Sequence, residues 1–406
     1  MFPLGFIYPV QTTAYHAGLI STPSALVLTG RVVVALLSSV GIWLVWRAAR
    51  DIWPAAPGYG VVAALLFATA GLNMSFGSSE LPRPVAAAFI LGAYVQLRRP
   101  GVRRQVLGGM LLGVAACFRF SEAAFVGVAV AASVPRSGWR AVVLLAASAG
   151  TAFLLIVGWT DYWYWGDAFH SLRAAIDYTL VQRLSSRGYQ TIGWYLLHVA
   201  DWLSPSVAVL AVIGTWIRRR DPLILWAWLP VCLLSALPHK EARYAIPAIA
   251  FLILIATEGL TGTLDHVLKA DVPHHAWKAP ALVALIGLGL LHDAGHWRLP
   301  RTNGDVVFAM TASAIIPPQA VISAEQPWRL GGHIYLGSRQ IVELDPARMM
   351  DPSYLSDAIP RGSWLMVDRR TSAARDSIHL FGLNGYVIEP VSVRDSHYAL
   401  WRPATE

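Results

Sequence analysis

The sequence predicts an α-helical membrane protein with about ten spans, followed by a small C-terminal α/β domain. Of its 406 residues, 55% are hydrophobic and only 14% are charged, whereas about a quarter of the residues of a soluble domain are charged. The mean hydropathy is +0.50. The net charge of +8 does not indicate nucleic-acid binding, because the Lys and Arg residues are spread over short loops between apolar runs.

Apolar runs predict the spans in chain order. The stretch before the first run, 1–23, lacks the basic segment and cleavage site of a signal peptide. Two of the runs could instead form one long helix that is interrupted at Arg119. The ten predicted spans are 25–46, 57–72, 84–97, 105–118, 123–135, 140–159, 192–216, 222–237, 245–260 and 279–294.

Basic residues predict the orientation, because short cytoplasmic loops carry the excess of Lys and Arg. With ten spans, the most basic short loops all fall on one side, which we predict to be cytoplasmic. These loops contain Arg47, Arg50, Arg98, Arg99, Arg103, Arg104, Arg136, Arg140, Arg218, Arg219 and Arg220. The loops predicted to face outside are 1–24, 76–84, 119–122, 161–191 and 239–244. We expect a multi-pass protein of a bacterial cytoplasmic membrane.

The composition divides the chain into a membrane domain, 1–297, and an external α/β domain, 298–406. Short β-type segments recur in the second part, at 320–324, 340–343, 363–367 and 385–393. The second part has no Gly-rich phosphate loop. The pair His292 and His296 lacks a third ligand, and the cysteines lie in apolar runs, so we predict no metal site and no disulfide.

A charged cluster between the runs 222–237 and 245–260 is the centre of the predicted active site. It has four ionisable residues within five positions, which cannot lie in hydrocarbon without partners. These residues are His239, Lys240, Glu241 and Arg243. A solvated loop that anchors two helix ends is the alternative. The mixture of an acid, bases and an imidazole on the predicted external side favours a functional site.

Two arginines close to or within predicted spans, Arg31 and Arg119, are further candidates, because an arginine in a span is costly unless it faces a cavity or an anion. Arg119 could instead lie in a turn, and Arg31 could extend to the membrane surface.

Four aromatic residues at 162–165 lie between two carboxylates, Asp161 and Asp167, where the longest external loop begins. They could form an interfacial aromatic belt or a surface on which a sugar stacks. Apolar residues at helical spacing over 168–184 predict a short amphipathic helix on the membrane surface.

The segment His239-Lys240-Glu241-Ala242-Arg243-Tyr244, followed by Pro247, resembles the His-Lys-Glu-x-Arg-Phe/Tyr signature of glycosyltransferase family 22. These polyprenyl-phosphate-mannose-dependent mannosyltransferases act in N-glycan and GPI-anchor assembly and have the multi-span GT-C fold. Three weaker similarities accompany this signature. The residues 2–9 and Gly30-Arg31 are similar to the segment that follows the family's first external loop. Asp161, Tyr164 and Gly166 resemble the family's Asp-x-x-x-Tyr-Gly element, and Gly188, Trp194 and Tyr195 resemble the ends of its Tyr-Gly-Thr-His-Pro-Trp-His-Trp-Tyr stretch.

The sequence also departs from this family. The family's Arg-Thr-Leu-Ser/Thr-Asn pattern is replaced here by Ser79-Glu80-Leu81-Pro82-Arg83. In the longer aromatic stretch, the family's Tyr, His, Pro and Trp are replaced by Arg187, Gln190, Thr191 and Ile192. Family members begin with a membrane helix and an external loop whose acidic residue is thought to be the catalytic base. This sequence starts after that point, so we expect Met1 to be an internal methionine of a longer reading frame and the principal base to be missing.

The resemblance implies that a sugar, expected to be mannose, moves with inversion from a polyprenyl-phosphate donor to a hydroxyl of a lipid-linked or surface glycan, without a cofactor. The transfer needs a carboxylate to accept a proton and cations to stabilise the departing phosphate. The candidate bases are Asp161 and Glu241; Glu241 is the weaker base because of its cationic neighbours. The predicted substrate-binding residues are His239, Lys240, Glu241, Arg243, Tyr244, Arg119, Arg31, Tyr164, Trp194 and Tyr195.

Two other functions remain open at this point. A transporter or flippase of lipid-linked sugars would share the intramembrane arginines and external aromatics, although the sequence shows no repeat of the kind that transporters commonly contain. A non-catalytic protein that binds lipid-linked sugars is the other alternative.

Overall fold

The computed structural model describes residues 10–11, 13–14, 16–19, 22–77, 83–177, 181, 190–237, 240–267, 274–294, 304–325, 327–330, 333–345, 348, 351–369, 385–391, 393 and 396–404. The chain divides into two compact units, Met1–Trp297 and Arg298–Glu406.

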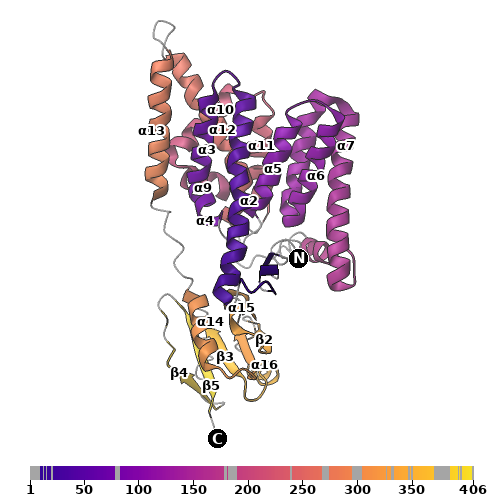
Figure 1. Ribbon diagram of the computed structural model, residues 1–406, viewed down its shortest axis with the longest axis vertical. Helices are drawn as coiled ribbons and strands as arrows, with labels where there is room; N and C mark the ends of the chain where they lie inside the picture. Colours follow the sequence, from indigo (N-terminus) through magenta and orange to yellow (C-terminus); the bar gives the residue numbers. More distant parts are fainter. Residues whose placement is uncertain are drawn as a thin grey trace. The chain divides into compact units, whose positions relative to one another are not determined.

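The first unit is helical, and α2, α3, α5, α6 and α7 run side by side along it (Figure 1). Two short 3-10 helices, η1 (Phe120–Ala123) and η3 (Ala242–Ala245), precede long helices. The α-helices are α2 (Pro23–Ile52), α3 (Pro57–Thr69), α4 (Gly71–Phe76), α5 (Arg83–Leu97), α6 (Val102–Phe118), α7 (Ala124–Trp165), α8 (His170–Ile176), α9 (Trp194–Leu203), α10 (Pro205–Ile217), α11 (Leu223–Ser235), α12 (Ile246–Val267) and α13 (His274–Ala294).

Within the described part of the chain, three segments are long and apolar enough to cross a membrane: Val27–Ile52, Phe120–Trp165 and Ala242–Thr263. Helices α9 and α10 meet this condition only as a pair, which is bent by 117°. The predicted helical membrane class is therefore confirmed, while the number of ten spans stays a prediction.

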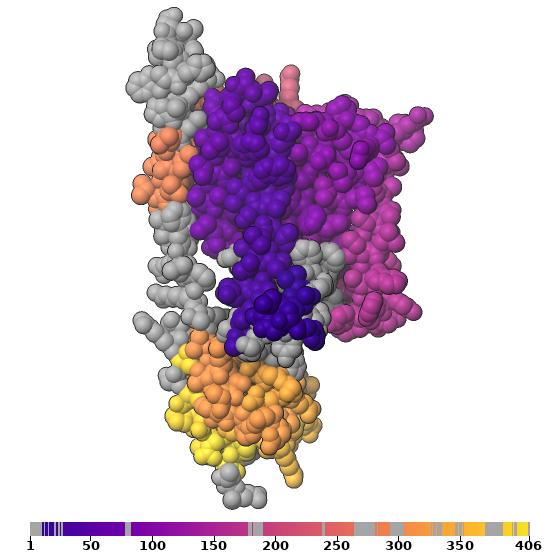
Figure 2. Space-filling model, viewed as in Figure 1, coloured from indigo at the N-terminus to yellow at the C-terminus, as the bar shows by residue number. Residues whose placement is uncertain are grey.

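The surface of α2 has the composition that contact with lipid requires. This helix lies at the front of the view in Figure 2, in indigo and purple. Its exposed large apolar side chains are Leu28, Val32, Leu36, Val40 and Trp43.

Helix α7 folds back on itself at Gly138. This glycine has a φ of 71°, in the left-handed region that favours glycine. The rings of Phe120 and Phe153 are 5.8 Å apart, whereas 33 residues of straight helix would extend about 50 Å. The fold-back lies between the predicted spans 123–135 and 140–159. An extended residue, Arg119, separates α6 from η1, so 105–118 and 123–135 also lie on different helices.

Helix α12 forms the centre of the unit. Of its most apolar window, 83% is buried, compared with 33% and 28% for the other two long segments. Two glycines let α10 lie directly against it, since a Cβ atom on Gly214 or Gly259 would come within 3.0 Å of backbone in the other helix.

The second unit is a small α/β domain, and its predicted class is confirmed. Its sheet has the order β2-β1-β3-β5-β4, with β1 parallel to β2 and β3, and β5 antiparallel to β3 and β4. The elements are α14 (Gly304–Ile315), β1 (Ile322–Glu325), η4 (Pro327–Leu330), α15 (His333–Leu336), β2 (Ile341–Leu344), α16 (Pro352–Ala358), β3 (Trp364–Asp368), β4 (Tyr386–Glu389) and β5 (Tyr398–Pro403). Strand β5 was not predicted.

Candidate functional site

Polar side chains from four segments of the helical unit meet where helices begin or break. We call this group the signature cluster. The segments are the start of α5, the break between α6 and η1, the start of α9 and the residues before α12. The cluster consists of Arg83, Arg119, Glu122, Tyr195, Lys240, Glu241, Arg243 and Tyr244.

Tyr244 is contacted by two guanidinium groups. The Cζ atom of Arg83 lies 3.5 Å from the centroid of the Tyr244 ring, and that of Arg119 lies 5.0 Å from it. Arg119 Nη2 also donates a hydrogen bond of 3.1 Å to the Tyr244 hydroxyl. Both contacts favour a planar guanidinium group over an ammonium group. They fix Tyr244 and Arg119 relative to each other.

Arg83 forms a buried ion pair with Glu122. Arg83 Nη1 and Glu122 Oε1 are 3.0 Å apart, and the two side chains are 1% and 3% exposed. Among the described residues, Arg83 Nε and Nη2 have no hydrogen-bond partner. The pair therefore holds a guanidinium group against the Tyr244 ring at a substantial cost in desolvation.

The backbone of the signature segment is held by Tyr195, which is fully buried. The Tyr195 hydroxyl accepts a hydrogen bond of 3.3 Å from the Glu241 N–H and donates one of 3.2 Å to the Glu241 carbonyl. The Glu241 carboxylate pairs with Arg243 Nε. Glu241 is thus fixed at its backbone and orients Arg243 with its side chain.

Lys240 is 5% exposed and lies outside the apolar helices. Its Nζ donates to two backbone carbonyls, at 2.5 Å to Leu237 and at 3.2 Å to Gln190. Burial lowers the pKa of Lys240. No carboxylate pairs with this ammonium group among the described residues, so a ligand with negative charge would supply its missing counter-charge.

The charges of the cluster do not balance. Counting only the residues that the structure describes, four cations face two carboxylates, which leaves an excess of two positive charges. Such an excess in a largely buried cluster suits an anion, and arginine and lysine together suit the oxygens of a phosphate.

The structure places Asp161 in α7, 2% exposed, with its carboxylate bound to Ser171 near the start of α8. It accepts a hydrogen bond of 2.8 Å from the Ser171 N–H and a second one from the Ser171 hydroxyl. These contacts join α7 to α8. Among the described residues, its hydrogen bonds do not reach the signature cluster.

The remaining predicted residues are more dispersed. Trp194 packs against Tyr195 at the start of α9, with ring centroids 5.0 Å apart, and so borders the cluster. Tyr164 is 67% exposed on α7, and Arg31 is exposed on α2. His239 lies outside the described residues, as do 1–9, 78–82 and Gly188.

Arg83 and Glu122 were not predicted to be site residues. The available signal was their position, since both are ionisable residues beside apolar runs in loops assigned to the same side as the signature segment. Among the described residues, no group of three or more His, Cys, Asp or Glu side chains could hold a metal ion.

Solved structures share the fold. ArnT from Cupriavidus metallidurans in the apo state matches with a TM-score of 0.66 and 14% identity, over 98% of this chain and 86% of that one. The structure of ArnT from the same organism bound to undecaprenyl phosphate matches with a TM-score of 0.61 and 15% identity, over 98% of this chain and 87% of that one. An oligosaccharyltransferase from Archaeoglobus fulgidus matches with a TM-score of 0.52 and 12% identity, over 90% of this chain and 60% of that one. These similarities confirm the GT-C fold that the signature implied.

One curated relative, GPI mannosyltransferase 3 of Yarrowia lipolytica, is 29% identical over 104 residues. The matched stretch covers 25% of this chain and only 20% of the relative. The model of the Alg9-like mannosyltransferase family matches residues 1–299, which include the whole signature cluster. The chain therefore belongs to the Alg9-like mannosyltransferase family.

Proposed function

We propose that this chain is a membrane-embedded mannosyltransferase that takes its sugar from a polyprenyl-phosphate donor. The family supports the sugar and the type of reaction, and one ArnT structure contains undecaprenyl phosphate. The observation that carries the proposal is the signature cluster, in which two positive charges have no carboxylate partner among the residues that the structure describes. A lipid-linked phosphate at the end of the helices would neutralise this excess.

In the proposed reaction, an acceptor hydroxyl attacks the anomeric carbon of mannose from the face opposite the phosphate. A new C–O bond forms, the bond between the sugar and the phosphate oxygen breaks, and polyprenyl phosphate leaves. Lys240, Arg243 and Arg119 bind the phosphate oxygens as negative charge accumulates on them. Arg83 and Glu122 act through Tyr244, which they hold in place beside Arg119.

The acceptor proton needs a carboxylate. Glu241 is paired with Arg243, so its geometry supports an orienting role. Asp161 is the other predicted base. It already accepts a hydrogen bond from the hydroxyl of Ser171, the type of contact that an acceptor hydroxyl would make.

We place the reaction on the extracytoplasmic face, with a lipid-linked or surface glycan as acceptor. The support is the distribution of basic residues, since Arg98, Arg136 and Arg218 lie away from the signature cluster. For example, α5 begins at Arg83 and ends just before Arg98, a length of about 22 Å.

A test of the site uses membranes that contain the wild-type chain, Lys240→Ala or Arg243→Ala. Transfer of label from polyprenyl-phosphate [³H]mannose into membrane glycan is measured. We expect each variant to lose about 10- to 100-fold in rate, because a hydrogen bond to a charged group contributes about 1.5–3 kcal/mol.

The matched control is Arg140→Ala, which removes an exposed arginine stacked on Trp139 near the fold-back of α7. It should transfer label at the wild-type rate. Unchanged transfer in both Lys240→Ala and Arg243→Ala would contradict the assignment of the signature cluster to the donor phosphate.

A further inference from the structure

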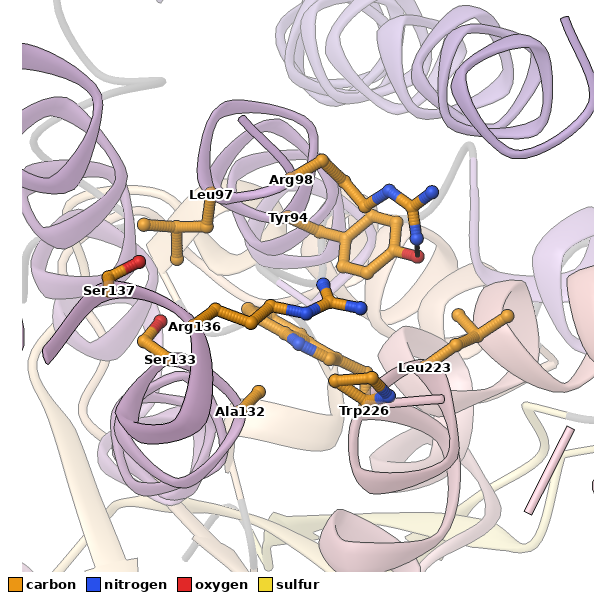
Figure 3. A pocket seen from close by; sticks show the side chains of 10 residues that line it. Tyr94, Leu97, Arg98, Ala132, Ser133, Arg136, Ser137, Leu223 and Trp226 are labelled. Atoms are coloured by element: carbon orange, nitrogen blue, oxygen red, sulfur yellow. Dashed lines mark hydrogen bonds between the residues drawn. The ribbon is translucent and has the colours of Figure 1, made fainter. Parts of the chain in front are cut away.

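A small cavity lies between α5, α7 and α11, at the basic end of the helical unit (Figure 3). Its volume is about 20 Å³, which is enough for about one water molecule or one oxygen of a larger group. The residues that line it are Tyr94, Leu97, Arg98, Ala132, Ser133, Arg136, Ser137, Pro222, Leu223 and Trp226. It is separated from the signature cluster by the length of α5.

Two arginines line this cavity. Arg136 extends between the rings of Tyr94 and Trp226, and Arg98, at the end of α5, lies at the edge of the cavity beside the Tyr94 hydroxyl (Figure 3). The hydrogen bonds of Arg98 are long and go to neutral acceptors, at 3.5 Å to the Tyr94 hydroxyl and at 3.4 Å to the Asp51 carbonyl. The nearest carboxylate of Arg136 is Asp221, at 3.9 Å. Both guanidinium groups are therefore only weakly paired.

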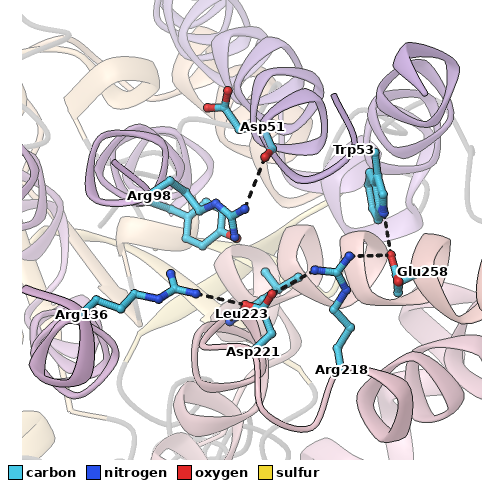
Figure 4. A network of polar contacts seen from close by, with 9 residues as sticks. Asp51, Trp53, Arg98, Arg136, Arg218, Asp221, Leu223 and Glu258 are labelled. Atoms are coloured by element: carbon cyan, nitrogen blue, oxygen red, sulfur yellow. Dashed lines mark hydrogen bonds and ion pairs between the residues drawn. The ribbon is translucent and has the colours of Figure 1, made fainter. Parts of the chain in front are cut away.

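The carboxylates nearby are already engaged (Figure 4). Asp221 accepts hydrogen bonds from Arg218 at 3.0 Å and from the Leu223 N–H at 2.9 Å. Burial alone would raise the pKa of Asp221, but these two donors and Arg98 lower it, so the carboxylate is ionised. Glu258 accepts from Arg218 at 3.1 Å and from Trp53 Nε1 at 2.5 Å. The third carboxylate nearby, Asp51, pairs with Arg99 at 2.8 Å and with Arg47 at 3.6 Å. Since Arg218 contacts both Asp221 and Glu258, these three side chains carry one negative charge against the two positive charges of Arg98 and Arg136, and one positive charge remains in excess beside the cavity.

The cavity also has hydroxyl groups. Ser133 lines it and is only 6% exposed. Ser137 accepts a hydrogen bond of 3.3 Å from Gln105, which leaves its own proton to donate. Two guanidinium groups and two hydroxyl donors around a space of this size are suited to the oxygens of a tetrahedral anion.

We propose that this cavity is a second phosphate-binding site, distinct from the signature cluster. One phosphate oxygen occupies the cavity on the side of Ser133, and the rest of the group lies at its mouth, where the Arg136 side chain is 46% exposed. The phosphate belongs to an anionic phospholipid headgroup or to free phosphate. Headgroups bind in basic pockets between helices at this depth of a membrane.

The experiment uses the purified full-length chain in neutral detergent. Binding of phosphatidylglycerol, phosphatidylcholine and inorganic phosphate is measured separately, by lipid counts in native mass spectrometry and by the shift of the unfolding temperature. We expect saturable binding of phosphatidylglycerol at least tenfold tighter than that of phosphatidylcholine. Arg136→Gln and Arg98→Gln should each weaken it by about tenfold or more.

Ser133→Ala provides a variant that keeps every charge and should weaken binding severalfold, so the test survives if an arginine variant does not fold. The matched control is Arg140→Gln, which removes an exposed positive charge that does not line the cavity and should bind within about twofold of wild type. Competition between inorganic phosphate and phosphatidylglycerol supports the site. The ligand that binds more tightly, phosphatidylglycerol or inorganic phosphate, identifies the source of the phosphate. Equal binding of both lipids, or equal losses in Arg140→Gln and Arg136→Gln, would overturn the proposal.

Discussion

Arg83 and Glu122 show how much one buried pair can contribute to the position of a neighbouring side chain. Both are almost inaccessible, and Arg83 lies directly over the Tyr244 ring. An isolated charge at either position would be severely destabilising, because the rest of the environment supplies little solvation. The pair is therefore a structural unit on which the position of Tyr244 depends.

Glu122→Gln should cost about 3–5 kcal/mol of stability, because it leaves the Arg83 guanidinium group buried without its counter-charge. The losses in the free energy of unfolding caused by Arg83→Gln and by Glu122→Gln should not add. The double variant Arg83→Gln/Glu122→Gln should be about 1–3 kcal/mol more stable than the sum of the two single losses predicts. The free energy of unfolding of all four proteins in mixed micelles measures this coupling. Additive effects would show that the two residues do not act as a pair.

At the scale of whole elements, α10 and α12 form a close helix contact. Their backbones touch at Gly214 and Gly259, where no side chain fits. Small residues at such positions allow helices in membranes to approach closely enough for dispersion contacts to hold them together. This contact fixes the central helix α12, and the signature segment directly precedes that helix.

Gly214→Ala should destabilise the protein by about 1–3 kcal/mol, because the new methyl group forces the two backbones apart. Gly150→Ala is the matched control, since a Cβ atom there meets nothing within 4 Å. It should be neutral or slightly stabilising, given the higher helix propensity of alanine. Unfolding temperatures of both variants in detergent test this difference. Equal stability of the two variants would contradict the packing described here.

The elements were more predictable than the contacts. Hydrophobic runs predicted the helical class and the break between 123–135 and 140–159, where α7 folds back at Gly138. The side of the membrane that each loop faces stays a prediction. Strand β5 was missed because its buried run, Tyr398 to Trp401, has no alternation of polar and apolar residues. Such a run cannot be identified as a strand by periodicity.

The site was predictable only where its residues are consecutive. The signature segment carries its own pattern, whereas Arg83 and Glu122 are 39 positions apart and Arg119 and Tyr244 are 125 apart. A single sequence does not show which polar residues in a predicted set of external loops touch each other. The contacts join three of those loops, 76–84, 119–122 and 239–244, in one cluster.

At the scale of the whole molecule, the helical unit has a cluster with excess positive charge at one set of helix ends and a second basic cavity at the other. A transferase, a transporter and a non-catalytic binder could all bind a lipid-linked sugar in such a unit. They differ in whether the bond between sugar and phosphate is broken.

The most direct measurement therefore uses purified chain in detergent micelles, where no compartments remain across which a transporter could act. Polyprenyl-phosphate [³H]mannose and an extract of acceptor glycolipids are supplied, and free polyprenyl phosphate and labelled glycolipid are measured together. We predict that both products form in equal amounts with the wild-type chain, and that both fall about 10- to 100-fold with Lys240→Ala. Donor that binds but is recovered intact would contradict the account.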